Sequence, residues 1–308
     1  MKTITLGKST LRASRLAYGC WRIAETEEMG RTVGRAAIHA AFEAGYTLFD
    51  HADLYCDGRA ESAFGAVLRD TPSMRDGIVI ATKCGIRKPG EPTEDAPFRY
   101  DFSSGHIVRS CEGSLRRLGV GTIDLYQLHR PDWLMNPEEI AAAFTQLREQ
   151  GKVREFGVSN FRPSQWTALQ SACSFPLIVN QVEISLAARG CFEDGTLDQC
   201  LAEKITPLAW SPLAGGLLAG EVRRLLPWQE KYPVEKVLLE LDAQAGALGT
   251  TRSNVALAWL LKHPAGIVPI VGSTRPEKIR EAADADAIEL TRESWYRLLE
   301  AARGEPLP

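Results

Sequence analysis

The sequence predicts an α/β fold, a (β/α)8 or TIM barrel that forms a single domain over residues 1–308 and carries a β-hairpin at its N-terminus. Short β-rich apolar runs recur eight times along the chain, each followed by a helical pattern, and no linker-like segment separates them. Strands that alternate with helices are parallel strands joined by crossover helices. Eight such units fit a closed barrel better than an open doubly wound sheet, which usually carries a G-x-G-x-x-G fingerprint that this chain lacks.

The first segment, TITLGKSTLRASRLA, reads as a hairpin ahead of the barrel, and we expect it to cover the barrel's bottom. The barrel strands are expected where apolar and β-branched residues cluster. In chain order, the eight predicted strands are 15–21, 47–51, 77–84, 122–129, 153–160, 177–184, 205–211 and 266–273.

Amphipathic stretches between these strands predict the crossover helices. In the stretch 137–151, Asn136 is placed as an N-cap, Pro137 takes the first helical position and Gly151 marks the end. Acidic residues in the first turn add a favourable interaction with the helix dipole. Two further helices are predicted over 31–45 and 251–264.

Three segments lack a regular pattern. The stretch 87–104 is too polar and proline-rich for regular structure. Because it follows the third strand, we expect a long loop there at the C-terminal mouth of the barrel, where substrates bind. The stretches 190–200 and 221–235 are loop or short-helix candidates.

The composition indicates a small-molecule partner. The chain is 44% hydrophobic and 24% charged with a formal net charge of -3, so it shows no electrostatic footprint for nucleic acid or an anionic membrane. No stretch approaches the roughly 20 apolar residues that span a bilayer, and the N-terminus lacks the apolar region of a signal peptide. The seven cysteines form no C-x-x-C pair, so the sequence signals neither a metal site nor disulfides. We therefore expect a cytoplasmic location with reduced cysteines.

Polar residues collect where the predicted strands end. Asp50 ends the second strand, Lys83 the third and His129 the fourth, and all strand ends of a barrel converge on one face. Taken singly, each residue also has a structural interpretation: Lys83 can extend its ammonium to water, His129 can be a core histidine, and Asp50 can cap a turn. Their repetition at one place in successive units favours an active site.

These residue types suit proton transfer to a carbonyl group without a metal. A tyrosine phenol has a pKa of about 10, which a nearby ammonium lowers and desolvation raises. Asp50, Lys83 and Tyr55 are therefore expected to form a relay in which the pKa of Tyr55 is tuned towards working pH, so that the phenol acts as general acid. His129 is expected to hydrogen-bond the carbonyl oxygen, where negative charge develops.

Seven motifs in this order resemble those of the aldo-keto reductases, and they span nearly the whole chain. The motifs are DHADLY, IATKCG, LYQLHRPD, GVSNF, NQVEISL, LAWSPLAGG and VGSTRPEKI. The likeness is greatest to the bacterial oxidoreductases of that superfamily. It implies a (β/α)8 barrel that reduces aldehydes or ketones with NADPH, with NADH not excluded. It also implies Tyr55 as general acid, with Asp50, Lys83 and His129 completing a catalytic tetrad.

The resemblance further implies a set of cofactor-binding residues. Ser159, Asn160 and Gln181 would hold the nicotinamide carboxamide, and Trp210 would stack on the nicotinamide ring. Segments later in the chain would bind the pyrophosphate and the adenosine 2'-phosphate. Glu281 would lie near the adenine. The residues implied for these later segments are Ser211, Pro212, Leu213, Gly215, Gly272, Ser273, Thr274 and Lys278.

The sequence departs from the family pattern in the nucleotide segment. The family often has arginine where Lys278 stands, and lysine cannot make the planar bidentate contact, so Arg275 or Arg280 is expected to compensate. An asparagine that often faces the adenine is replaced by Ala282.

The substrate pocket is expected to include Trp21 and His51. Trp21 follows the first strand, and because the family usually keeps a small residue near Cys20, the resemblance implies a narrowed, apolar pocket here. The partner of the protein is expected to be a small carbonyl compound, and a monomer is favoured because no interface pattern stands out.

Two other functions stay open from the sequence. The first is a barrel aldolase that uses Lys83 as a Schiff-base nucleophile, which requires a depressed pKa for the amine. The second is a cofactor-binding regulatory or redox-sensing subunit with little turnover. The complete tetrad disfavours this second function, because a sensor has less need of the acid.

Overall fold

The computed structural model describes residues 1–221 and 234–308. Within these ranges, eight parallel strands close into a barrel in the order β10-β11-β12-β3-β4-β5-β8-β9, which confirms the predicted fold class. Each predicted strand range contains one of these strands. Their bounds are β3 (Ala17–Gly19), β4 (Leu48–Asp50), β5 (Val79–Cys84), β8 (Ile123–Leu128), β9 (Val153–Ser159), β10 (Leu177–Glu183), β11 (Thr206–Trp210) and β12 (Val268–Val271).

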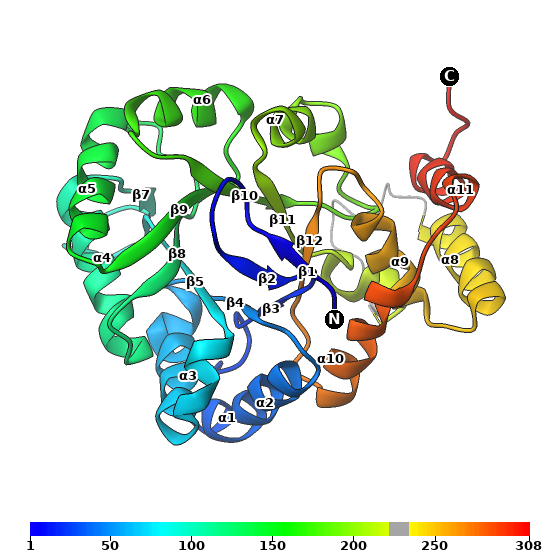
Figure 1. The fold of residues 1–308 in the computed structure, drawn as a ribbon, viewed down its shortest axis with the longest axis horizontal. Helices are drawn as coiled ribbons and strands as arrows, with labels where there is room; N and C mark the ends of the chain where they lie inside the picture. Colours follow the sequence, from blue (N-terminus) through cyan, green and yellow to red (C-terminus); the bar gives the residue numbers. More distant parts are fainter. Residues whose placement is uncertain (222–233) are drawn as a thin grey trace.

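Helices surround the barrel and bury its outer face (Figure 1). The helices α8 (Val234–Leu248) and α11 (Arg292–Arg303) lie farther out and pack beside α9. The surrounding helices are α2 (Arg35–Glu43), α3 (Arg59–Asp70), α4 (Ser104–Leu118), α5 (Pro137–Glu149), α6 (Pro163–Ala172), α7 (Thr196–Glu203), α9 (Arg252–Leu261) and α10 (Pro276–Ala283).

The predicted helix 137–151 is present as α5, and its start follows from its cap. The Asn136 side chain accepts hydrogen bonds from the backbone N–H groups of Glu138 and Glu139 at 3.0 and 3.3 Å. These bonds satisfy two of the donors that an α-helix leaves open at its start. Gly151, beyond the helix end, has a positive φ of 68°.

The predicted helix 31–45 starts differently from the expectation. The short helix α1 (Glu27–Met29) runs into a π-helical turn over Gly30–Gly34, and regular α-helix begins only with α2. A Cβ atom at Gly34 would collide with the carbonyl oxygen of Ile23. The turn therefore lets the chain pass close to the segment before it, which a periodicity of apolar residues does not reveal.

The N-terminal hairpin is confirmed and covers the bottom of the barrel. Strands β1 (Thr3–Thr5) and β2 (Arg12–Ser14) pair antiparallel, and Figure 1 shows them across the barrel end. Leu6 and Leu11 are buried in one cluster with apolar residues of the barrel interior. The Gly7 backbone N–H donates to Thr206 Oγ1 at 2.8 Å, which fixes the hairpin to the start of β11.

The predicted loops differ in part from the structure. The segment 87–104 is mostly irregular, but β6 (Ile86–Arg87) and β7 (Arg99–Tyr100) form a two-residue antiparallel ladder at its base. Two residues per strand are too few to show alternation in a sequence. The segment 190–200 contains a 3-10 turn, Gly190–Phe192, and the start of the eight-residue helix α7, which agrees with its prediction as a loop or short helix.

The predicted loop 221–235 lies almost entirely outside the described residues, which resume at Val234 with α8. Among the described residues, no helix is both long enough and apolar enough to cross a bilayer.

Candidate active site

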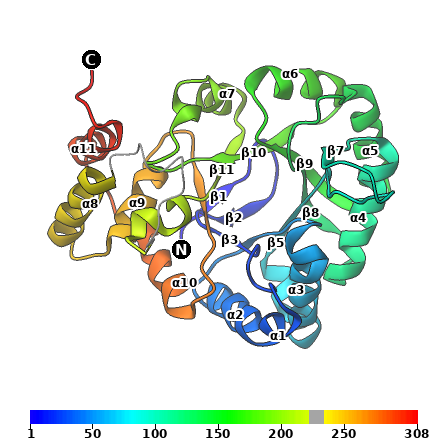
Figure 2. The same cartoon turned by 180° about the vertical axis from the view of Figure 1, so that it is seen from behind.

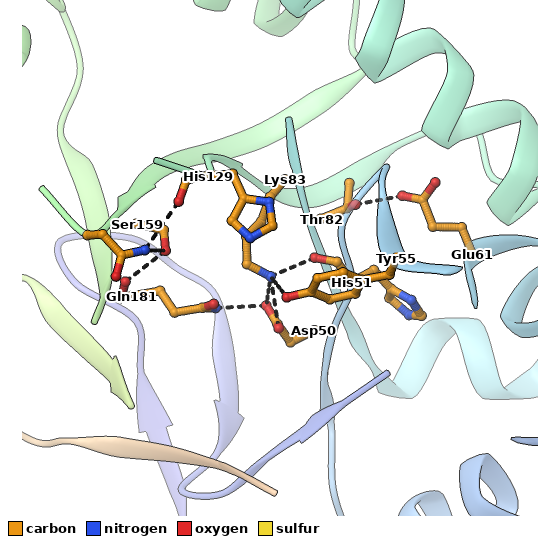
Figure 3. A network of polar contacts seen from close by, with 10 residues as sticks. Asp50, His51, Tyr55, Glu61, Thr82, Lys83, His129, Ser159 and Gln181 are labelled. Carbon is orange, nitrogen blue, oxygen red and sulfur yellow. Dashed lines mark hydrogen bonds and ion pairs between the residues drawn. The ribbon is translucent and has the colours of Figure 1, made fainter. Parts of the chain in front are cut away.

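The carboxyl ends of the strands meet at the barrel end opposite the hairpin (Figure 2). Lys83 lies there on β5 with no exposed surface. Its Nζ donates to both carboxylate oxygens of Asp50, at 2.7 and 2.9 Å, to the His51 carbonyl oxygen at 2.7 Å and to Tyr55 Oη at 3.2 Å (Figure 3). The structure thus brings the acid, the ammonium and the phenol of the predicted relay into direct contact.

The chain reaches this arrangement by extending the barrel ladder beyond β4. The His51 N–H donates to the Ala81 carbonyl at 2.8 Å, and the Asp53 N–H donates to the Lys83 carbonyl at 3.0 Å. These two bonds hold the segment along β5 until it turns into the 3-10 helix η2 (Tyr55–Gly58). The turn places the phenol of Tyr55 above the lysine that the next strand supplies.

The charge state of Lys83 follows from competing effects. Burial lowers the pKa of this amine, but the Asp50 carboxylate and Tyr55 outweigh it, so the pKa is raised above its ordinary value. The amine therefore stays protonated. An aldolase that uses Lys83 as nucleophile would need the opposite shift, so this environment disfavours that function.

The pKa of Tyr55 is shifted in the direction opposite to the expected tuning. Burial raises the pKa of the Tyr55 phenol more than the Lys83 ammonium lowers it, so the net direction is upward. The reason is the surroundings of the ring, since Trp21 and His129 lie against it with ring centroids 6.4 and 5.8 Å away. The phenol is thus held in its protonated form, which is the form that a proton donor needs.

His129 follows β8 and is 9% exposed. Burial, with the nearby charges of Lys83 and Arg130, lowers its pKa well below the ordinary value for histidine. Its imidazole is therefore neutral at pH 7. The ring stands edge-on to Tyr55, and no hydrogen bond among the described residues occupies its Nδ1 atom.

A chain of hydrogen bonds joins the predicted carboxamide residues to the tetrad. Trp210 Nε1 donates to Asn160 Oδ1 at 3.0 Å, and Asn160 Nδ2 donates to Ser159 Oγ at 2.8 Å. Ser159 Oγ donates in turn to the Gln181 carbonyl at 2.8 Å. Gln181 Nε2 then donates to Asp50 Oδ1 at 2.8 Å (Figure 3). These four residues come from β9 and the position after it, from β10 and from the end of β11, and they form one hydrogen-bonded wall beside the lysine.

Asn160 holds this wall at a bend in the backbone. Its φ is +61°, in the left-handed region that asparagine tolerates better than most residues. The bend lets Nδ2 also donate to the His129 carbonyl oxygen at 3.2 Å. The Gln181 side chain uses its Nε2 for Asp50, and no hydrogen bond to its side-chain oxygen is found among the described residues, so this oxygen can accept from an amide such as the nicotinamide carboxamide.

The segment after β11 fits a ligand that approaches the backbone. Ser211, Gly215 and Gly216 all have positive φ values, so the chain coils tightly there. A Cβ atom at Gly215 or at Gly272 would meet no atom within 4 Å, which leaves open space at both positions. Pro212 is buried, whereas Leu213 and Ser211 are half-buried at the mouth. The residues present therefore fit a dinucleotide that runs along this side of the barrel.

The predicted adenosine end is rich in ion pairs. Lys278 Nζ lies 2.9 Å from a carboxylate oxygen of Glu281, and both residues belong to α10. Ser273 lies in the turn before this helix, where its Oγ accepts from the Arg275 N–H at 3.2 Å, and half-buried Thr274 lies between them. A phosphate at this position would compete with Glu281 for the ammonium.

The two arginines that were expected to compensate for Lys278 already have carboxylate partners. Arg275 pairs with Glu221, and Arg280 pairs with Glu43 at 3.2 Å. Arg280 thereby points to the end of α2. Arg275, which is half-exposed beside the turn, remains the better placed of the two.

The two predicted substrate residues differ in position. Trp21 is 56% exposed and its ring lies 6.4 Å from that of Tyr55, and its role in the substrate pocket stays a prediction. The expectation for His51 is wrong, because its ring is completely buried and packs edge-on against Phe64 at 4.5 Å. A pattern of alternating side chains could not show on which side of the short turn the imidazole would fall.

Sequence reasoning missed a second polar network behind the tetrad. Thr82 Oγ1 donates to Glu61 Oε1 at 2.6 Å, and Arg117 Nε donates to Glu61 Oε2 at 2.7 Å. Burial and the neighbouring Glu61 raise the pKa of Asp53 to about 7. The signal in the sequence is weak, because Glu61 and Arg117 look like ordinary solvated residues of amphipathic helices.

Sequence reasoning also missed Arg130, although it stands directly after His129 in LYQLHRPD. Its guanidinium carbon lies 5.2 Å from the centroid of the Trp210 ring. A charged residue immediately beyond a strand end was the signal that could have identified it.

The chain is similar to several known proteins. A profile of the aldo/keto reductase family matches residues 15–303. The chain is 42% identical to a 6-dehydroglucose reductase of Novosphingobium aromaticivorans, with 98% of this chain and 96% of the relative covered. It is 36% identical to the oxidoreductase YdhF of Escherichia coli over the full length of both. The structure resembles the holo form of an aldo-keto reductase from Bacillus halodurans, with a TM-score of 0.83, 26% identity and coverage of 98% and 96%.

Proposed function

Because the chain belongs to the aldo/keto reductase family and is an NAD(P)H-dependent oxidoreductase, we propose that it reduces aldehydes or ketones to alcohols with NADPH and with Tyr55 as general acid. The observation that carries this proposal is the buried Lys83 ammonium, which contacts the Asp50 carboxylate and the Tyr55 phenol at once.

In this mechanism, Tyr55 gives its proton to the carbonyl oxygen of the substrate. Tyr55 Oη already accepts a hydrogen bond from Lys83, so its own hydrogen is free to point into the mouth. As the proton leaves, negative charge develops on the phenol oxygen, and the adjacent ammonium stabilises it. Asp50 keeps that ammonium charged and in position.

His129 orients the carbonyl group. Because its imidazole is neutral at pH 7, it can donate a hydrogen bond to the carbonyl oxygen without competing with Tyr55 as the proton donor. A neutral donor also leaves the net charge of the site unchanged. Its ring stands next to the phenol, so both groups can reach one oxygen atom.

NADPH supplies the hydride when it is bound. Gln181, Ser159 and Asn160 would hold the nicotinamide end and Trp210 would lie on its ring, while Ser211 to Gly215 would follow the pyrophosphate. We assign the preference for NADPH over NADH to Lys278, with Ser273 and Thr274 beside it, because an ammonium and hydroxyl groups suit a 2'-phosphate. Glu281 would release Lys278 as the phosphate arrives.

The first carbonyl substrates to examine include sugar aldehydes. A relative that shares 42% of its residues with this chain is named a 6-dehydroglucose reductase. 6-Dehydroglucose therefore belongs in a panel with simple aldehydes, ketones and dicarbonyls. NADPH consumption against this panel, repeated with NADH, tests both the reaction and the cofactor preference.

The decisive variant is Tyr55→Phe, which removes only the phenol oxygen. We expect it to bind NADPH like the parent protein, because Tyr55 is not among the residues assigned to the cofactor. Carbonyl reduction should fall by about 100-fold or more, since proton transfer by a positioned acid contributes 10²–10⁴-fold. Quenching of tryptophan fluorescence measures the binding, and NADPH absorbance measures turnover.

Tyr296→Phe on the outer helix α11 serves as the matched control, because this tyrosine is exposed and far from the mouth. Wild-type turnover by Tyr55→Phe would show that another group donates the proton. A wild-type protein that binds NADPH but reduces nothing in the panel would instead support the regulatory or redox-sensing function.

A further inference from the structure

Among the described residues, Arg130 at the mouth of the barrel makes no salt bridge with a carboxylate, although its charge acts on the nearby Glu183. It follows His129 and is half-buried, and its guanidinium lies over Trp210. Across residues 1–221 and 234–308, no salt bridge or hydrogen bond of its side chain is found. A guanidinium has five N–H donors, and withdrawing them partly from water has a cost unless a polar group meets them.

Glu183 is the neighbour of Trp210 on the adjacent strand, and its carboxylate is also without a salt bridge or hydrogen bond among the described residues. It ends β10, and its Cα pairs with that of Trp210 in the parallel register of β10 and β11. Burial raises the pKa of its half-buried carboxyl, and Arg130 lowers it only in part. Within the described part of the chain, its carboxylate has neither a salt bridge nor a hydrogen bond.

The position of Arg130 separates it from the segment that is expected to bind the adenosine phosphate. Arg130 extends from β8, and the segment expected to bind the adenosine phosphate follows β12. In the barrel order, β8 and β12 lie on opposite sides of the ring. Arg130 directly follows His129 in the chain, and its charge helps to lower the pKa of that imidazole, so the guanidinium lies near the carbonyl-orienting residue. A substrate held by His129 is therefore the ligand best placed to supply a polar group to Arg130.

We propose that Arg130 and Glu183 form a specificity pair that selects uncharged, polyhydroxylated carbonyl compounds. This inference rests on the proposed carbonyl reduction. The charge of an anionic substrate would be attracted by Arg130 and repelled by Glu183. The charge of a cationic substrate would be attracted by Glu183 and repelled by Arg130. Hydroxyl groups donate to a carboxylate and accept from a guanidinium, so a neutral polyol satisfies both. Trp21, exposed beside Tyr55, offers an aromatic surface for the C–H groups of such a chain.

Three aldehydes with four carbons test the proposal: butanal, D-erythrose and 4-oxobutanoate. We expect the wild-type protein to prefer erythrose over butanal in kcat/KM, because a site built to hydrogen-bond hydroxyls rejects the analogue that lacks them. Arg130→Met and Glu183→Gln should each lower the ratio of erythrose to butanal by about tenfold, which corresponds to the loss of one net hydrogen bond. Arg130→Met keeps an apolar stem over Trp210, and Glu183→Gln keeps the shape of the side chain.

Arg297→Met and Glu149→Gln are matched controls at exposed positions of outer helices, and both should retain the wild-type ratio. An unchanged ratio in Arg130→Met and Glu183→Gln would overturn the proposal. So would a preference for 4-oxobutanoate that is lost in Arg130→Met and enhanced in Glu183→Gln, since it would identify an anion site.

A second measurement keeps this proposal separate from the proposed reaction. If the wild-type protein reduces none of the three aldehydes, carbonyl reduction fails, and calorimetric titration of the NADPH-loaded protein with erythritol and with 1-butanol then tests the pair alone. Selective binding of erythritol that Arg130→Met and Glu183→Gln weaken would support it. Equal or absent binding of the two alcohols would overturn it.

Discussion

Lys83 shows how a fully buried ammonium is tolerated in an apolar barrel. Burying a charge is costly unless it is paired and hydrogen-bonded, and Lys83 meets three oxygen-bearing partners within 3.2 Å. One of these partners, the His51 carbonyl, is a backbone group. The lysine therefore also fixes the chain that leads to Tyr55, and its position and charge depend on the same contacts.

His51 is the opposite case, because its polar atoms are buried without partners. Among the described residues, neither ring nitrogen makes a hydrogen bond, and burial with the nearby Lys83 charge lowers the pKa of His51 to about 3. The folded protein thus keeps this imidazole neutral where an unfolded chain protonates it. Below the unfolded pKa of about 6.5, this difference removes stability progressively until the pH reaches about 3.

His51→Phe should therefore stabilise the protein, and more so at low pH. The ring would keep its packing against Phe64, and the unpaired nitrogens would be lost. As the pH falls from 8 to 5, the free energy of unfolding of the variant should exceed that of the wild type by a further amount of about 2 kcal/mol. The pH then lies about 1.5 units below the unfolded pKa of about 6.5, and each unit corresponds to about 1.36 kcal/mol. Urea unfolding at both pH values measures this difference.

His39→Gln on α2 is the control, because His39 is only half-buried. If wild type and His51→Phe lose stability equally between pH 8 and pH 5, the imidazole of His51 is not kept neutral by folding.

At the scale of single elements, the helices whose ends carry chemical signals were the predictable ones. Asn136 and Pro137 define the start of α5, and Thr251 caps α9 by accepting from the Asn254 N–H at 3.3 Å. The π-helical turn at Gly30–Gly34 had no such signal, since it depends on a close approach to Ile23. Local sequence therefore predicts an element when its boundary is stabilised locally.

Asn136→Ala should destabilise the protein by about 1 kcal/mol, because two backbone N–H groups at the start of α5 lose their acceptor. Asn136→Asp should retain nearly all of the stability, since aspartate is an equally good cap and suits the positive helix end. The free energy of unfolding in urea compares the two variants. If Asn136→Ala and Asn136→Asp have the same free energy of unfolding, water replaces the side-chain oxygen as the acceptor for these N–H groups.

At the scale of the whole molecule, the barrel closure explains why the active site was predictable from strand ends. Asp50, Lys83 and His129 are far apart in sequence, but parallel strands in a ring must bring their carboxyl ends together. Once eight strands were identified, the meeting of these residues followed. The direction of each side chain beyond a strand end did not follow, because it depends on single turns.

This limit accounts for the two main errors at the site. His51 points into the core and not into the mouth, and the pKa of Tyr55 rises because its neighbours desolvate it. Both depend on packing between elements that are distant in sequence. The charges of the residues and their spacing in the sequence indicate which groups lie together, but not how far those groups are exposed to solvent.

The hairpin β1–β2 closes the barrel from below, and this has a kinetic consequence. Both ligands of a reductase must then enter and leave through the same mouth. The residues assigned to the nicotinamide, Ser159 and Gln181, are at most 2% exposed, whereas Trp21 is 56% exposed. NADPH would reach deeper than the substrate, so it should bind first and its oxidised form should leave last. In product-inhibition experiments with NADPH as the varied substrate, NADP⁺ should therefore inhibit competitively, and the alcohol product should inhibit noncompetitively. Competitive inhibition by the alcohol product against NADPH would contradict this order of binding and release.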